Sequence, residues 1–214
     1  MDLSRIGLHI YEIRNQFTYI EGNVGILNQA LEKGNNAGAF MALQSIFISA
    51  SQVSRMLWAP RKVGKARSDE LRKFLGIPDE HPLNNKDLQT LFDFSDEKTE
   101  EWIKNSKGKY ILADYIGDLA ASEHKDVLIE HILRSFDLKS KIYIYRGVGF
   151  QMDNVMNAMR GISDAVNKAH AHLFPNHWKD PDQKPKKTSK NKETEEKSNT
   201  KKKPAAKAKS KKKD

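Results

Sequence analysis

Hydrophobic residues recur every three or four positions along the first 31 residues. The spacings alternate strictly between three and four, giving a mean period of 3.5, at Leu3, Ile6, Ile10, Ile13, Phe17, Ile20, Val24, Leu27 and Leu31. An α-helix places residues with this period on one face, so the pattern predicts a long amphipathic helix. Gly34 and the two asparagines after it predict its end. Such a face can form a bundle core or a dimeric coiled-coil seam, and the other amphipathic segments favour the bundle.

The same periodicity predicts further helices. They cover approximately residues 40–57, 71–75, 83–105 (one helix or two), 127–136 and 152–169. The first of these ends before Pro60, because the residue preceding proline disfavours the helical region. Residues 61–67 carry four positive charges and are predicted to be a basic loop. Such a loop could receive phosphates, and the favoured interpretation is that it is simply solvated. Residues 110–122 show no regular pattern.

One segment has the character of a β-strand. Residues 141–146, KIYIYR, are rich in β-branched and aromatic residues. Gly147 and Gly149 predict a turn, after which residues 150–152 can return as a second strand. We therefore expect a mainly α fold with one small β-hairpin near residues 141–152.

Composition changes abruptly after Trp178. Residues 179–214 contain 15 lysines, no arginine and six acidic residues, whereas residues 1–178 contain 22 basic and 22 acidic residues. The formal net charge of +9 is therefore the charge of the last segment alone. That segment has no aromatic residue and cannot bury enough apolar surface to offset its ordering entropy. We predict one folded domain at 1–178 and a disordered lysine-rich tail at 179–214.

Composition also bears on location. No apolar run approaches the roughly 20 residues that span a bilayer, and the first residues lack the apolar centre of a secretory signal. The absence of cysteine excludes disulfides and thiolate metal sites. We expect a cytoplasmic protein without membrane insertion.

Several short stretches follow one another in a characteristic order between residues 40 and 160. They are LQSIF (43–47), VSRMLW (53–58), LRKFLGIP (71–78), HPL (81–83), SDE (95–97) with Trp102, DYIG (114–117), FD (136–137) and YRG (145–147). Together they resemble a family of uncharacterised bacterial proteins with a HEPN-like helical fold. The resemblance implies a HEPN-like helical bundle for the folded domain. HEPN-like domains often dimerise, so the resemblance also leaves a homodimer open.

The resemblance brings an expectation about chemistry. HEPN ribonucleases carry an Arg followed, after four to six residues, by a His, which supply a cation at the scissile phosphate and an acid or base near the 2′-hydroxyl. In the proteins that this chain resembles, the motif reads R-N-H-F-E-H-F-D-E, and the matching stretch here is QTLFDFSDE at residues 89–97. Gln89 replaces the Arg, Leu91 the first His and Phe94 the second. We therefore expect the fold without that chemistry.

An alternative set of catalytic residues lies in the first predicted helix. Arg14 and Tyr19 keep the rhythm of the motif, with Tyr in the His position. A tyrosine titrates near ~10, which makes it a poor general base at neutral pH. The alternative function is a HEPN-type ribonuclease of a defence or toxin system that uses these noncanonical residues. The competing interpretation is a polar helix face beside Phe17.

Other constellations predict little chemistry. His170 and His172 are two residues apart, which places them about 200° apart on a helix, so we predict no metal site there. The acidic cluster between Asp93 and Glu101 is interpreted as a solvated face. The chain has no Gly-rich phosphate loop and no GxSxG or HExxH motif, so we predict no cofactor and identify no small-molecule substrate.

The lysines near the C-terminus are the strongest functional signal. Lysine binds phosphate chains as a hydrated point charge, by counterion release and without reading sequence, so DNA and RNA are equally acceptable. An anionic membrane surface would attract the same charge, and a solubilising or localisation tail is the competing interpretation. We expect a non-catalytic binding or interaction protein that contacts nucleic acid through Lys201, Lys202, Lys203, Lys207, Lys209, Lys211, Lys212 and Lys213.

Overall fold

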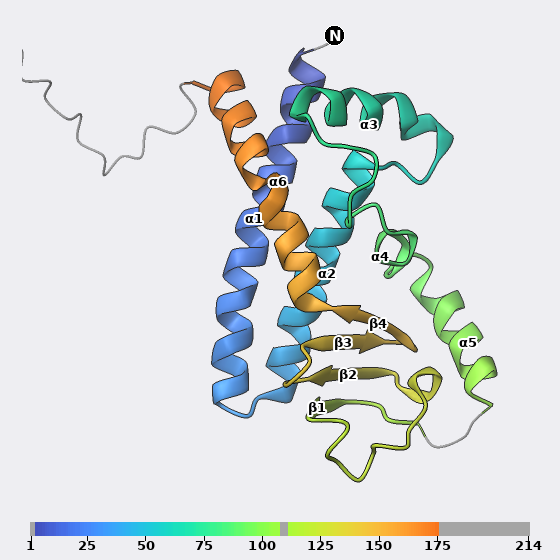
Figure 1. Ribbon diagram of the computed structural model, residues 1–214. Helices are drawn as coiled ribbons and strands as arrows, with labels where there is room; N and C mark the ends of the chain where they lie inside the picture. Colours follow the sequence, from blue (N-terminus) through green and yellow to red (C-terminus); the bar gives the residue numbers. More distant parts are fainter. Residues whose placement is uncertain (1–2, 108–110, 176–214) are drawn as a thin grey trace, which may run out of the picture. The chain divides into compact units, whose positions relative to one another are not determined.

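The computed structural model describes residues 3–107 and 111–175 (Figure 1). Within these ranges it has six α-helices and four strands, which confirms the mainly α fold with a small β component. The helices are α1 (Leu3–Glu32), α2 (Asn36–Leu57), α3 (Lys62–Leu75), α4 (Lys86–Thr90), α5 (Ser95–Ser106) and α6 (Met152–Leu173), and a short 3-10 helix, η1, spans Ile129–His131. The strands are β1 (Tyr115–Gly117), β2 (Arg134–Asp137), β3 (Ile142–Tyr145) and β4 (Val148–Gln151). The tail predicted for residues 179–214 lies outside the described residues.

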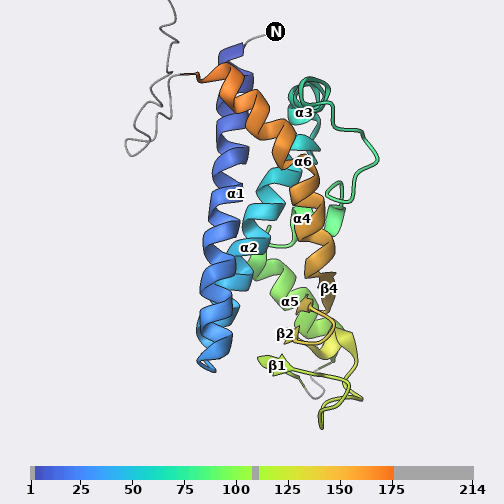
Figure 2. The ribbon, with the colours of Figure 1, turned by 60° about the vertical axis from the view of Figure 1, so that its left-hand side comes forward.

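The hydrophobic series of the first segment forms the buried face of α1. Ile6, Ile10 and Ile13 are at most 1% exposed, and Ile20 and Leu27 follow at 3% and 2%. At Gly34 the backbone takes a φ of +63°, and the Asn35 side chain then accepts a hydrogen bond from the Gly38 amide at the start of α2. The two helices pack along each other, so the predicted bundle core is confirmed (Figures 1 and 2).

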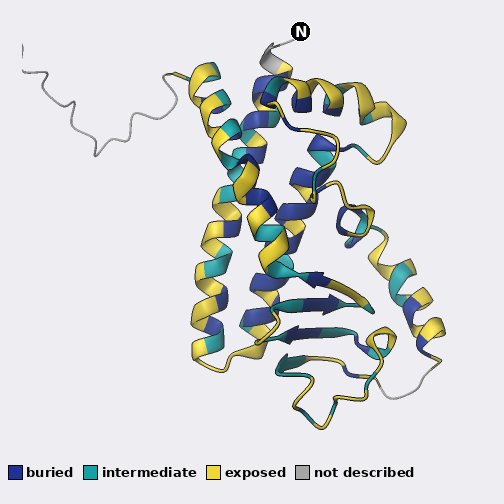
Figure 3. Cartoon of the chain, in the orientation of Figure 1, coloured by how far each residue is buried: buried dark blue, intermediate teal, exposed yellow. Residues whose placement is uncertain are grey.

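Helix α2 is the central element of the core. More than half of its residues are buried, and Figure 3 shows dark blue along most of its length. The helix packs against α1, α3 and α4, and its Phe47 ring stacks on Tyr143 of the sheet, with ring centroids 4.9 Å apart. Helix α6 packs against α1 through a face that includes the buried residues Met159, Ile162 and Val166.

The sheet has the order β1-β2-β3-β4. Strands β3 and β4 form the predicted hairpin, with Tyr145 paired to Val148 across a two-residue turn. The turn lies earlier than predicted, because Gly149 is part of β4 and Met152 begins α6. Arg146 and Gly147 occupy that turn with φ values of 49° and 76°, as a type I′ turn requires. The hairpin is only half of the sheet, because β2 pairs antiparallel with β3 and β1 pairs parallel with β2. The sheet is therefore larger than the single hairpin that the sequence predicted.

The helix predicted at 127–136 is wrong. This segment forms η1 and then β2, whose backbone bonds to β1 and β3. Its Ile132 and Phe136 are spaced four apart, as on a helix, but they enter two separate apolar clusters. Residues 110–122 likewise contain β1, which the local pattern did not reveal.

The basic loop predicted at 61–67 is also wrong, because α3 begins at Lys62 and carries these residues on its first two turns. Gly64 lies within the first turn of this helix. A Cβ built at this glycine would lie only 2.7 Å from the Ala59 Cβ. The glycine therefore permits close packing of α3 against the preceding segment rather than a break in the helix.

None of the helices in the described ranges has both the length and the apolar character needed to cross a membrane.

Candidate functional site

The stretch that matches the family motif runs from the end of α4 to the start of α5, and its first residue is part of the core. Gln89 is 5% exposed, and its Nε2 donates a hydrogen bond to the Trp58 carbonyl at 3.0 Å. The Gln89 carbonyl in turn accepts bonds from Ser51 Oγ and Arg55 Nη1. Gln89 therefore links α4 to the last two turns of α2 and the residue that follows it.

The other two motif positions are equally unsuited to acid–base work. Leu91 is buried at 4% exposure, whereas Phe94 is 57% exposed and holds a left-handed backbone with a φ of 45°. Phe94 is the residue before α5, and Ser95 is its first helical residue. These two positions therefore contribute apolar packing and a change of chain direction, and no acid–base group.

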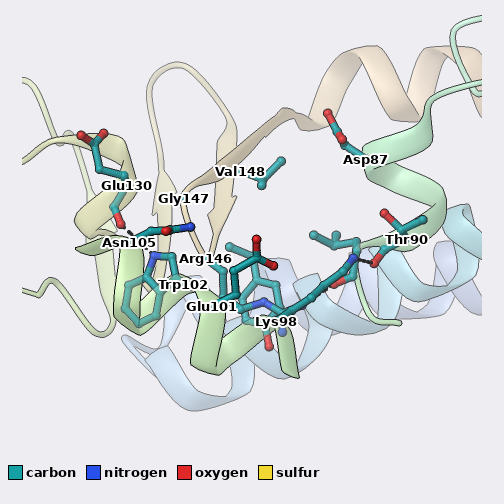
Figure 4. Close-up of a pocket in the computed structure, with 12 residues that line it drawn as sticks. Asp87, Thr90, Lys98, Glu101, Trp102, Asn105, Glu130, Arg146, Gly147 and Val148 are labelled. Carbon is teal, nitrogen blue, oxygen red and sulfur yellow. Dashed lines mark hydrogen bonds between the residues drawn. The ribbon is translucent and has the colours of Figure 1, made fainter. Parts of the chain in front are cut away.

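Two cationic side chains that are far apart in the sequence lie close together beside this stretch. Arg146, from the β3–β4 turn, donates through Nη1 to the Ser95 carbonyl at 2.8 Å and through Nη2 to the Leu91 carbonyl. Lys98, from α5, donates to the Thr90 carbonyl. Both side chains line a pocket of about 280 Å³ between α5 and the hairpin (Figure 4).

The electrostatics of this pocket are mixed. Burial lowers the pKa of the Lys98 ammonium, and the neighbouring Arg146 lowers it further, while Asp93, Asp87 and Glu101 oppose the shift. Trp102 closes one side and donates its indole N–H to the Glu130 carbonyl at 2.8 Å. Both cations are held by main-chain carbonyls, and none of the described residues lining the pocket is a histidine. The arrangement therefore fastens the hairpin to α5.

Arg14 and Tyr19, the alternative catalytic pair, both lie on α1. Five residues of helix separate them by about 140° around the axis. Arg14 is half-buried, and the Tyr19 side chain is 52% exposed. The helix therefore directs the two side chains toward different surroundings.

The two histidines near the end of α6 also face different ways. His170 is buried at 5% exposure, with its ring 6.0 Å from that of Tyr11 and 5.0 Å from that of Phe174. His172 is exposed. Across residues 3–107 and 111–175, no three His, Asp or Glu side chains gather as a metal ion would require.

The eight tail lysines proposed as nucleic-acid contacts lie outside the described residues. Within the described residues, no sequence pattern predicted that Lys98 and Arg146 lie close together. The only sequence signal for it was the Arg-Gly pair of the hairpin turn, which does not indicate the helix that the arginine contacts.

Comparison of the chain with protein-family models, with curated proteins and with solved structures finds no match. The HEPN-like resemblance therefore rests on the ordered sequence stretches alone.

Proposed function

We propose that this chain is a non-catalytic, HEPN-like binding protein whose lysine-rich tail gives it sequence-independent affinity for nucleic acid. The observation that carries the proposal is the separation of charge: residues 1–178 are neutral overall, and residues 179–214 hold the whole net charge of +9. A chain of lysines without arginine or aromatic residues has the chemistry for phosphate contacts, but lacks the groups that read or stack on bases.

The described residues support the non-catalytic part of the proposal. At the positions where the family motif has an arginine and two histidines, this chain has a buried amide, a buried leucine and an exposed phenyl ring. The Gln89 amide is occupied by its bond to the Trp58 carbonyl. A group that is buried and already hydrogen-bonded offers neither a proton acceptor nor a cation to a phosphodiester.

The proposal predicts a steep dependence of binding on salt. Each phosphate neutralised by a lysine contributes roughly −0.9 to the slope of log K against log salt concentration, so the eight lysines can contribute about −7. Affinity should then fall about a thousandfold or more between about 50 and about 200 mM salt.

The test compares three full-length proteins by fluorescence anisotropy with a short RNA of mixed sequence and with the corresponding DNA duplex. The second protein has Lys201, Lys202, Lys203, Lys207, Lys209, Lys211, Lys212 and Lys213 replaced by glutamine, and the third has them replaced by arginine. We expect the glutamine variant to lose affinity and several units of salt slope, and the arginine variant to keep both. Equal affinity of the glutamine variant and the native chain would overturn the proposal.

A further inference from the structure

Helix α3 presents a group of lysines to solvent. It carries five basic residues and two acidic ones, within a domain whose net charge is zero. Lys62, Lys65 and Lys73 are all exposed, and the 100° step of the helix places them within an arc of about 80°. No ion pair involves any of the three in the part of the chain that the structure describes. We call these residues the α3 lysine face.

The one acidic side chain within that arc is already paired with an arginine. Asp69 pairs with Arg72 at 2.6 Å, and Asp79 pairs with the same guanidinium at 2.6 Å. Arg72 is buried and also donates to the Leu57 carbonyl at the end of α2. The arginine balances one of the two negative charges, so the three lysines still outnumber the acidic charge that remains beside them.

The positive charge also stands where the helix itself disfavours it. Lys62 and Lys65 occupy the first turn of α3, which contains no acidic residue, and Arg61 provides no side-chain cap. The helix dipole is positive at this end, so cations here raise the energy of the folded protein. An anion bound at this end of the helix would relieve the unfavourable interaction.

A polar pocket of about 730 Å³ adjoins the face. Its wall carries the cations Lys65, Arg72 and Lys73 and the carboxylates Asp69 and Asp79, an excess of one positive charge. Trp58 also lines it. This residue is 6% exposed, and its indole N–H has no acceptor among the described residues. The excess of cations over carboxylates favours an anionic ligand beside the lysines.

We propose that the α3 lysine face, with the adjoining pocket, binds the phosphate backbone of the nucleic acid that the tail contacts. The inference rests on the proposed function and extends it by assigning a contact surface on the folded domain. Lys62 and Lys73 are separated by about 16 Å along the helix axis, so the face extends beyond one phosphate and suits a polymer.

The face does not have the character of a membrane-binding helix. Leu71 and Leu75 are buried in the core, and Phe74 packs against it. Val63, at 90% exposure, is the one large apolar side chain that α3 exposes. A helix that lies in a lipid interface needs a continuous exposed apolar face. The apolar face of α3 is instead packed against the protein core.

The experiment uses full-length protein with Lys62→Gln, Lys65→Gln and Lys73→Gln combined. The matched control removes three other exposed lysines, by Lys33→Gln, Lys104→Gln and Lys125→Gln. Both triple variants are made with the native tail and with the glutamine tail, and each is titrated against RNA, duplex DNA and vesicles containing phosphatidylserine. We expect the α3 variant to bind nucleic acid about tenfold more weakly than the control variant, with a salt slope lower by about 2 to 3 units.

The two proposals fail in different ways. If the α3 variant and the control variant bind nucleic acid equally well while the glutamine tail abolishes binding, the face is not a contact surface and the tail proposal stands. If the glutamine tail changes nothing while the α3 variant loses affinity, the tail proposal fails and the face is the contact. If the α3 substitutions weaken vesicle binding and leave nucleic-acid binding unchanged, the face belongs to a membrane and the inference is overturned.

Discussion

The guanidinium group of Arg146 joins two parts of the chain that lie about 50 residues apart in the sequence. It is 8% exposed and donates to the Leu91 carbonyl, the Ser95 carbonyl and the Thr99 hydroxyl. Its backbone also adopts the left-handed conformation that the two-residue turn requires. One residue thus takes part in the turn of the hairpin through its backbone and in the attachment to α5 through its side chain.

Substitution of Arg146 should therefore destabilise the folded domain strongly. Arg146→Ala removes the donor from three buried or half-buried acceptors, and we expect the free energy of unfolding to fall by about 3 kcal/mol. Arg146→Lys keeps the charge but not the planar fork, so about 2 kcal/mol should be lost. Urea denaturation followed by circular dichroism measures both. Arg160→Ala, an exposed arginine that contacts Asn157, is the control and should change stability by less than about 0.5 kcal/mol. Equal effects at the two positions would show that Arg146 is not an anchor.

Among the elements, the helices of the core were predictable and the sheet was largely not. The apolar residues of α1 and α2 repeat within one segment, so their pattern contains the information that determines the helix. Strand β2 is held by β1 and β3, which belong to other parts of the chain, and its Phe136 shows a helix-like spacing with Ile132. Only the hairpin could be recognised, because both of its strands and its turn are contiguous.

Helix α1 contains two exposed glycines whose role the structure clarifies. Glycines such as Gly22 and Gly25 can allow a neighbouring helix to approach closely. A Cβ built at either position meets no atom within 4 Å, so no described neighbour requires the glycine.

Gly22→Ala should therefore stabilise the isolated domain. Alanine lowers the backbone entropy of the unfolded chain and fits an open helical position, so we expect a gain of about 0.5 to 1 kcal/mol in the free energy of unfolding. Thermal denaturation measures the change. The control is Gly147→Ala, where the φ of +76° and a Glu130 Cα only 3.1 Å from the new Cβ predict a loss. A loss at Gly22 as well would indicate that a partner, such as a second copy of the chain, packs on this face of α1.

At the scale of the whole molecule, the candidate contacts follow from how charge is distributed. The tail lysines could be found by counting residues, because they are contiguous. The α3 lysine face could be found only in part. The basic run of residues 61–67 is visible in the sequence, whereas Lys73 joins Lys62 and Lys65 only because the segment is a helix and not the predicted loop. The proximity of Lys98 and Arg146, whose like charges repel, could not be predicted either, because only the fold brings their two segments together.

The last prediction concerns catalysis by the complete chain. A ribonuclease centre needs a proton-transferring group and a cation converging on one phosphodiester. The motif positions supply neither, and Arg14 and Tyr19, which lie about 140° apart on α1, offer in place of the histidine a tyrosine, a side chain that titrates near ~10. We expect purified full-length protein to bind RNA and leave it intact, as judged by denaturing gel electrophoresis after long incubation at low salt. Arg14→Ala and Tyr19→Phe should give the same result, and Lys33→Gln serves as the neutral control. Cleavage by the native chain that Arg14→Ala or Tyr19→Phe abolishes, and that Lys33→Gln leaves unchanged, would contradict this prediction and establish the ribonuclease alternative.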